Sequence, residues 1–137
     1  MSDIQIGAAT HAGKAHAENQ DAFYFYPPGD TYSSSKGILM AIADGMGGHA
    51  GGATASKMAI DILSNEYYNS VNNPDPLEAL KDAFMKANRL ILERSQNDHD
   101  VAGMGTTQTA IVIKGDKYFL GQAGDSRGYI IDQDSII

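Results

Sequence analysis

The pattern of apolar and polar positions predicts strands in the first third of the chain. Apolar and polar residues alternate over 4–10, which is typical of a strand with one buried face. The aromatic-rich segment 21–26 ends at a Pro-Pro-Gly-Asp turn signal, and it predicts a second strand. The segment 37–43 is almost wholly apolar, which predicts a central strand buried on both faces.

Apolar residues then recur at helical spacing through the middle of the chain. A first helical stripe follows Gly51 and consists of Ala55, Met58, Ala59, Ile62 and Leu63. A second helix is predicted to begin at Asp75-Pro76-Leu77-Glu78 and to continue to about Gln96. This start resembles a capping box, with Asp75 as the N-cap and Pro76 at the first helical position.

Further β-type segments close the chain, at 106–113, 117–123 and 127–131, with a short hairpin connection at 114–116. Strands that are grouped together favour an α+β fold with antiparallel sheets over a doubly wound parallel sheet. A chain of 137 residues fits one domain, 1–137. The chain stops on apolar residues without a capping element, so we expect this domain to be truncated.

Composition excludes several classes of function. The net charge of -7 argues against nucleic acid as the main partner, because a phosphate backbone requires a basic face. No apolar run approaches the roughly 20 residues of a membrane span, and the N-terminus lacks the layout of a signal peptide. The absence of cysteine excludes disulfides and thiolate metal sites and fits a reducing cytosol, so we expect a cytoplasmic protein without a membrane partner.

The most informative segment is Asp44-Gly45-Met46-Gly47-Gly48, which follows the most apolar predicted strand. A carboxylate at a strand end, beside glycines that let backbone oxygens approach, suits a hard cation. Asp21 and Asp125 also lie at predicted strand ends. Single carboxylates from separate strands suit Mg²⁺ or Mn²⁺, particularly a pair of ions that share one aspartate. The simpler interpretation is that each aspartate only caps a turn, and it is weakest for Asp44.

The same glycines admit a nucleotide-binding interpretation. Gly45 to Ala50 matches the G-x-G-x-x-G/A pattern and opens a predicted helix, where a phosphate group can bind. No βαβ unit surrounds this segment, and Asp44 would repel a pyrophosphate. No Gly-Lys-Ser/Thr is present, which excludes a P-loop. His49 within the segment is either a proton donor near Asp44 or a structural loop residue.

Short motifs follow one another in order along the chain: Asn19-Gln20-Asp21-Ala22, Asp44-Gly45-Met46-Gly47-Gly48-His49, Gly103-Met104-Gly105-Thr106-Thr107 and Gly121-Gln122-Ala123-Gly124-Asp125-Ser126-Arg127-Gly128-Tyr129. Together they resemble the N-terminal part of the metal-dependent Ser/Thr protein phosphatases of type 2C, in their bacterial branch. Each motif alone is modest evidence, but their combination is specific and spans nearly the whole chain. The resemblance implies a β-sandwich flanked by helices, with Mn²⁺ or Mg²⁺ held at one end between the sheets.

The resemblance also implies roles for particular residues. Asp44 would bridge both metal ions, and Gly45 would offer its backbone carbonyl. Asp21 would serve the second ion, directly or through water, and Asp125 matches the position that helps to hold a third, weaker ion. A metal-bridging water would attack the phosphorus of phosphoserine or phosphothreonine in line. No phosphoenzyme is needed, which agrees with the absence of a cysteine nucleophile.

The chain departs from the family pattern in two places. Family members usually carry an arginine that clamps the substrate phosphate at the position of His16, and imidazole lacks the bidentate fork of arginine. Lys14 is the candidate substitute, while Asp44 and His16 are the candidate catalytic residues. The remaining metal aspartates of the family belong to motifs further downstream, so we expect this chain to be weak or inactive alone.

The expected function is therefore metal-dependent dephosphorylation of proteins, in a signalling role. The expected partner is a phosphoprotein, the target of a Ser/Thr kinase. Two alternatives stay open at this point. One is a phosphatase-like module that binds a partner without catalysis, and the other is a nucleotide-binding domain built on Gly45 to Ala50.

Overall fold

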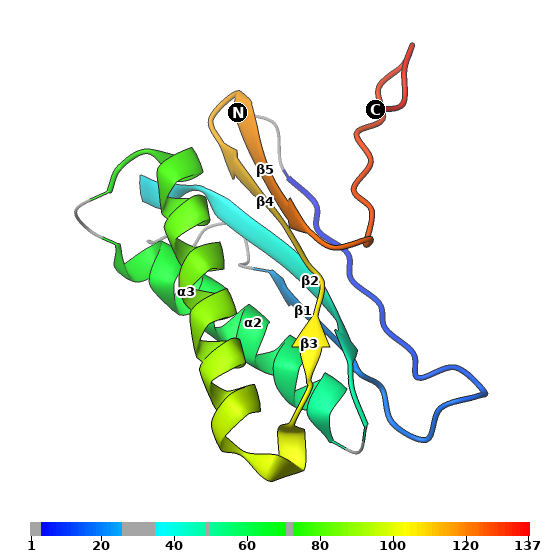
Figure 1. Cartoon of the computed structure of the whole chain (residues 1–137). Coiled ribbons are helices and arrows are strands. Elements are labelled where there is room, and N and C mark those ends of the chain that lie inside the picture. Colours follow the sequence, from blue (N-terminus) through cyan, green and yellow to red (C-terminus); the bar gives the residue numbers. More distant parts are fainter. Residues whose placement is uncertain (1–3, 26–34, 49, 71–72) are drawn as a thin grey trace.

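The chain folds into two layers, an antiparallel sheet and a pair of long helices that cover one of its faces (Figure 1). The computed structural model describes residues 4–25, 35–48, 50–70 and 73–137. The α+β class with antiparallel strands, expected from the grouping of strands in the sequence, is confirmed. The described residues contribute a single sheet layer, and the second sheet of a sandwich is not among them.

The sheet has the strand order β1-β2-β4-β5, with β3 paired to the end of β2. The strands are β1 (Asp21–Phe25), β2 (Ile38–Met46), β3 (Gly105–Thr106), β4 (Gln108–Lys114) and β5 (Lys117–Ala123). These confirm the strands predicted at 21–26, 106–113 and 117–123. The predicted hairpin connects β4 to β5, where Lys114 pairs with Lys117 and Gly115 takes a φ of 63° that favours glycine.

The helices α2 (Gly51–Asn69) and α3 (Pro76–Asn97) pack against each other and against the sheet. At the start of α3 the Asp75 side chain accepts a hydrogen bond from the Leu77 amide at 3.0 Å, as the capping pattern predicted. The apolar face predicted for α2 packs against the sheet. Leu63 of this face belongs to the same buried core cluster as Leu39 and Val112, and all three side chains are fully buried. Neither helix, nor any other in the described ranges, is long and apolar enough to cross a membrane.

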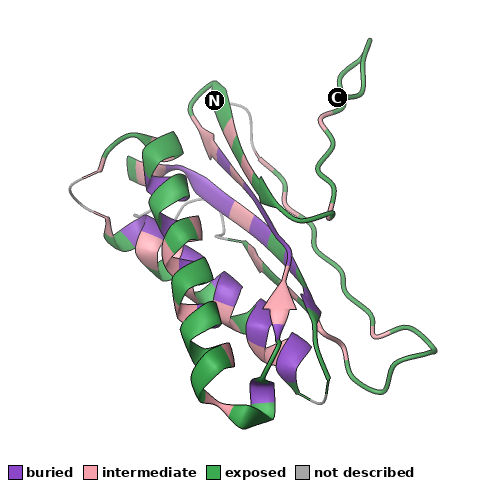
Figure 2. Ribbon diagram, viewed as in Figure 1, coloured by how far each residue is buried: buried purple, intermediate pink, exposed green. Residues whose placement is uncertain are grey.

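Burial on the sheet is one-sided. Along β2 the side chains of Leu39, Ala41 and Ala43 are buried beneath the helices, whereas Ile42 between them is 46% exposed. Figure 2 shows the buried residues gathered where the helices meet the sheet. The prediction that 37–43 is buried on both faces is therefore wrong for the described chain, because its helices supply a covering layer on one face only.

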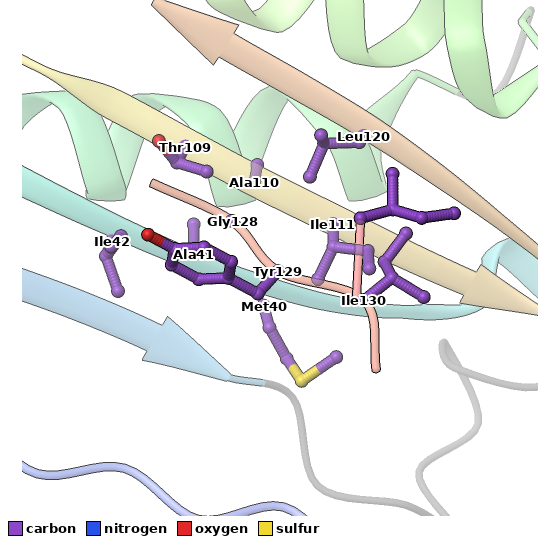
Figure 3. Close-up of a pocket in the computed structure, with 11 residues that line it drawn as sticks. Met40, Ala41, Ile42, Thr109, Ala110, Ile111, Leu120, Gly128, Tyr129 and Ile130 are labelled. Carbon is purple, nitrogen blue, oxygen red and sulfur yellow. The ribbon is translucent and has the colours of Figure 1, made fainter. Parts of the chain in front are cut away.

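The other face of the sheet is apolar and hollowed. A cavity of about 250 Å³ lies there between β2, β4 and the C-terminal segment, which carries Tyr129 and Ile130 across the strands (Figure 3). Thr109 lines it, and its Oγ1 is buried without a hydrogen-bond partner in the described structure. Large apolar side chains of β1, β2 and β5 are exposed, namely Phe23, Phe25, Ile42, Tyr118 and Leu120.

The strands predicted at 4–10 and 127–131 are wrong. A strand needs a neighbour for its backbone hydrogen bonds, and the only strand paired with β1 in the described sheet is β2. At the other end, Ile130 and Ile137 exchange two backbone hydrogen bonds of 2.8 Å, so this segment folds back on itself. The alternating pattern at 4–10 and the β-type segment at 127–131 are therefore present without a sheet to join.

A cluster of polar contacts ties the end of α2 to the beginning of β2. The ammonium group of Lys36 donates to the Tyr67 carbonyl at 3.0 Å and to the Ser70 hydroxyl at 2.9 Å, while the Tyr67 hydroxyl donates to the Lys36 carbonyl at 2.7 Å. The hydroxyl of Tyr68 accepts a hydrogen bond from the Leu39 amide at 3.1 Å. A cation at a helix C-terminus satisfies carbonyls that have no partner within the helix.

Tyr67 generates a prediction about alkaline stability. Its burial, with a contribution from Asp75, raises the pKa of the Tyr67 phenol to about 12. The stabilising contribution is complete below the unfolded pKa of about 10 and is lost as the pH rises towards the folded pKa, with a slope of about 1.4 kcal/mol per pH unit. At pH 8 we expect Tyr67→Phe to lower the free energy of unfolding by about 1 kcal/mol through the lost hydrogen bond.

Urea unfolding of the wild type and Tyr67→Phe at pH 8 and at pH 11 measures this effect. The stability difference between the two proteins should shrink at pH 11, because the variant lacks the group whose ionisation favours the unfolded chain. Tyr118→Phe is the matched control, since Tyr118 is 52% exposed and its removal should change neither value. A difference that stays constant between the two pH values would contradict the assignment.

Candidate metal and phosphate site

Two acidic residues face each other at one end of the sheet. In the antiparallel pairing of β1 with β2, Asp21 is the direct partner of Asp44. Directly opposite residues project to the same face, roughly 4.5–5.5 Å apart at Cβ, and like charges there are destabilising. Both residues are exposed, so solvent and ions reach them. The register thus brings together two of the aspartates that the sequence singled out.

The third predicted acid, Asp125, also contributes to the electrostatics of Asp44. Partial burial is the first cause that raises the pKa of Asp44 above its usual value, followed by the charge of Asp21 and a hydrogen bond with its carboxyl group. The charge of Asp125 raises the pKa of Asp44 further. Each of these effects disfavours the charged carboxylate, and a cation among the three acids would act in the opposite direction.

The backbone at Asp44 is fixed from both neighbouring segments. Its carbonyl accepts a hydrogen bond from the Thr107 amide at 2.9 Å, and its amide donates to the Thr107 hydroxyl at 3.0 Å. On the other side the Gly45 amide donates to the Gln20 carbonyl at 3.0 Å. Asp44 is therefore held in place by segments on either side of β2.

The glycines after Asp44 are explained by close packing. A Cβ atom on Gly45 would overlap the Gly52 carbonyl, and one on Gly52 would lie 2.6 Å from the side-chain Cδ of Gln20. The end of β2 thus touches the first turn of α2 with no room for side chains. This contact accounts for Gly45, the first glycine of the proposed nucleotide-binding pattern, without a bound nucleotide, and so weakens the nucleotide-binding interpretation.

The loop after β5 carries Asp125 and is anchored to the same threonine. The hydroxyl groups of Thr107 and Ser126 share a hydrogen bond of 2.7 Å. Gly124 takes a φ of 98°, and a Cβ atom there would lie 2.7 Å from the Thr107 Cγ2. Thr107 therefore connects the backbone of Asp44 to the loop of Asp125. The sequence placed Thr107 in a motif but assigned it no role, because its partners are distant along the chain.

A hollow of about 410 Å³ lies over this end of the sheet. Asp21 and Asp44 line it, and its other polar lining residues are Thr10, His11, Ser126 and Arg127. The sequence analysis did not identify His11 or Arg127 as site residues. Arg127 belongs to the fourth motif but received no role there, and no motif includes His11, because the segments that carry these two residues come together only in the folded chain.

Other predicted site residues are not brought into this hollow. Lys14 and His16 lie exposed in the irregular segment before β1, and neither lines it. Their assignment to the substrate phosphate stays a prediction. The charge of Asp125 raises the pKa of Asp44, but Asp125 does not line the hollow. His49 lies outside the described residues.

The donors present fit a hard divalent cation in kind. Carboxylate and carbonyl oxygens are the ligands that Mg²⁺ and Mn²⁺ prefer, and a bound cation would offset the repulsion that Asp44 experiences from Asp21 and Asp125. The described donors are too few to complete the coordination shell of such a cation. Within the described ranges no group of three or more His, Asp or Glu side chains converges closely enough to hold a metal ion. Asp21, Asp44 and the Gly45 carbonyl would therefore supply part of a coordination shell.

Comparisons with known proteins identify the family. Residues 9–137 match the family model described as protein phosphatase 2C. The chain is 35% identical over 132 residues to the Ser/Thr protein phosphatase PstP of Mycobacterium tuberculosis H37Rv, covering 93% of this chain and 23% of that protein. It is 31% identical over 105 residues to the Ser/Thr phosphatase stp of Listeria innocua, covering 74% of this chain and 42% of that protein.

Solved structures agree with this result. The crystal structure of the M. tuberculosis phosphatase PstP/Ppp matches with a TM-score of 0.73 at 35% identity, over 91% of this chain and 48% of that chain. The catalytic domain of PstP in complex with two manganese ions matches with a TM-score of 0.73, over 90% of this chain and 49% of that chain. The chain thus spans about half or less of the proteins it matches. The sequence and structural matches together show that the chain belongs to the protein phosphatase 2C family.

Proposed function

We propose that this chain forms the metal-binding end of an enzyme that removes phosphate from phosphoserine and phosphothreonine in proteins. The observation that carries the proposal is the pairing of Asp21 with Asp44 across β1 and β2, with Asp125 near enough to raise the pKa of Asp44. The named relatives are Ser/Thr protein phosphatases, which supports a phosphoprotein as the substrate.

In this proposal the acidic residues divide the work of holding cations. Asp44 bridges two Mn²⁺ or Mg²⁺ ions, and the Gly45 carbonyl and Asp21 each serve one of them. Asp125 contributes to a third, weaker site. Cations held by these residues would supply a water of lowered pKa as the nucleophile for in-line attack on the phosphorus. The two manganese ions in the solved PstP catalytic domain support this assignment.

The remaining polar contacts of the site serve to position these groups. Thr107 holds the Asp44 backbone through two hydrogen bonds and binds Ser126 through its hydroxyl. The packing of Gly45 on Gly52 fixes the end of β2 relative to α2. A site whose carboxylates are held by the backbone before the metal binds loses little entropy on binding. We propose that the chain alone is a weak catalyst, because the described donors supply only part of a shell.

The expected cellular setting follows from the same proposal. The substrate is a phosphoprotein produced by a Ser/Thr kinase, and the enzyme acts in signalling in the cytoplasm. The net charge of -7 makes nucleic acid an unfavourable partner. No membrane partner is proposed.

A non-catalytic binding module is the second candidate. The incomplete set of metal ligands and the exposed apolar face of the sheet favour it over a complete enzyme within this chain. Its distinguishing property is that it binds metal or a phosphoprotein without turning over a phosphate ester.

Metal binding predicts a change in thermal stability of known sign. Mn²⁺ should raise the unfolding temperature of the wild type. At a free Mn²⁺ concentration of about 100 times the dissociation constant, the free energy of unfolding should increase by about 2.7 kcal/mol. Asp44→Asn should be slightly more stable than the wild type in EDTA, by about 0.2–1 kcal/mol, because it removes the repulsion from Asp21. The same variant should lose most of the gain from Mn²⁺.

Thermal unfolding in EDTA and in excess MnCl₂ measures both effects. Asp61→Asn is the control, because Asp61 is an exposed acid on α2 away from the site, and its response to Mn²⁺ should equal that of the wild type. An Asp44→Asn protein that gains as much stability from Mn²⁺ as the wild type would rule out Asp44 as a ligand.

Catalysis is tested by hydrolysis of p-nitrophenyl phosphate and of a phosphothreonine peptide. We expect slow hydrolysis that requires Mn²⁺ and that falls about a hundredfold in Asp44→Asn. Hydrolysis that persists in EDTA, or that is unchanged in Asp44→Asn, would contradict the proposed mechanism. Metal binding without any hydrolysis would favour the binding module.

A further inference from the structure

The hollow over Asp21 and Asp44 contains a cation that the sequence analysis assigned to no function. Arg127 lines it, and among the described residues that do so it is the only arginine or lysine. Metal ions held by the carboxylates would attract a phosphate group, and a guanidinium in the same lining would add further positive charge and hydrogen-bond donors for its oxygens. The position of Arg127 therefore bears directly on how an anionic substrate is held.

The backbone at Arg127 is fixed relative to the acidic residues. The Ser126 hydroxyl bonds to the Thr107 hydroxyl at 2.7 Å, and Thr107 in turn holds the backbone of Asp44. The side-chain amide of Gln122 donates to the Ser126 carbonyl at 2.5 Å. The segment that presents Arg127 is thus tied, at the residue immediately before it, to Thr107 just before β4 and to Gln122 of β5.

The charge of Arg127 is not neutralised by a neighbouring acid. Within the part of the chain that the structure describes, no carboxylate forms an ion pair with it, whereas Arg89 and Arg94 pair with Glu93 and Asp98. Its polar contact is with the Tyr129 hydroxyl, at 3.4 Å from Nη1.

A second hydrogen-bond donor lies in the same hollow. The Nδ1 atom of His11 accepts a hydrogen bond from the Gly13 amide at 2.8 Å. The proton of the neutral ring is therefore on Nε2, which is left as a donor. The Arg127 guanidinium without an ion-pair partner, the His11 donor and the Ser126 hydroxyl are suited to phosphate oxygens, and they share the lining of the hollow with Asp21 and Asp44.

We propose that Arg127 binds the substrate phosphate through its guanidinium group, in the role that the family pattern assigned to the position of His16. The inference rests on the proposed phosphatase function and specifies how that site recognises its substrate. A guanidinium supplies paired N–H groups that match two phosphate oxygens, which neither Lys14 nor His16 provides. Those two residues also lie outside the hollow.

The test uses inorganic phosphate as the probe, in the presence of saturating Mn²⁺. Binding is measured by isothermal titration for the wild type, Arg127→Met, Arg127→Lys and His16→Ala. We expect Arg127→Met to weaken phosphate binding about tenfold to a hundredfold, as the loss of a charge-assisted contact implies. Arg127→Lys should lie between the two, and His16→Ala should equal the wild type.

Two controls keep the result interpretable. Arg89→Met removes an exposed arginine of α3, away from the hollow, and should leave phosphate binding unchanged. The stabilisation of each variant by Mn²⁺ alone reports whether the fold and the metal site are intact, and Arg127→Met should match the wild type in that measurement. Equal phosphate binding by Arg127→Met and the wild type would overturn the proposal, as would a loss caused by His16→Ala instead. Absence of phosphate binding by the wild type would overturn it as well.

Failure of the phosphatase function has a different outcome. Phosphate binding that depends on Arg127, together with no hydrolysis of p-nitrophenyl phosphate, would disprove catalysis by this chain and leave the role of Arg127 supported. Where hydrolysis does occur, Arg127→Met should raise KM for the ester more than it lowers kcat, because the lost contact binds the substrate phosphate in the ground state as well.

Discussion

The close contact between the end of β2 and the first turn of α2 is the constraint on which the rest of the site depends. Gly45 and Gly52 lie so near each other that a Cβ atom on Gly45 would overlap the Gly52 carbonyl. This contact joins the helical layer to the strand that carries Asp44. The hydrogen bonds from Asp44 to Thr107 and from Thr107 to Ser126 then extend the same fixed geometry to the loop of Asp125. The site is thus held by backbone and hydroxyl contacts.

Holding the acids in this way has an electrostatic consequence. Asp21 and Asp44 are direct cross-strand partners, and their repulsion is built into the register of the sheet. Partial burial raises the pKa of Asp44, and the charge of Asp21 raises it further. A divalent cation converts an unfavourable arrangement into a favourable one, so the free energy of metal binding and the stability of the fold are linked. On the proposed function, Arg127 then provides the positive charge that faces the substrate.

The sheet shows why sequence patterns predicted some elements and missed others. The apolar segment 37–43 indicated a strand covered on both faces, yet the described chain covers one face, and Ile42 is 46% exposed on the other. The alternating residues at 4–10 and the β-type residues at 127–131 favour strands, but in the described chain neither segment has a neighbouring strand to pair with. Periodicity reports which residues favour burial, whereas strand formation also needs a partner for the backbone.

The sequence by itself determined the features that depend on neighbouring residues. The Asp75-Pro76 cap starts α3, Gly115 turns the hairpin, and the ordered motifs identified the family and its aspartates. Only the tertiary structure decided which side chains share the hollow with those aspartates. Arg127 and His11 line it, while Lys14 and His16 do not. The reason is physical: loop positions here are set by hydrogen bonds between residues far apart in sequence, such as Thr107 with Ser126, which no local pattern encodes.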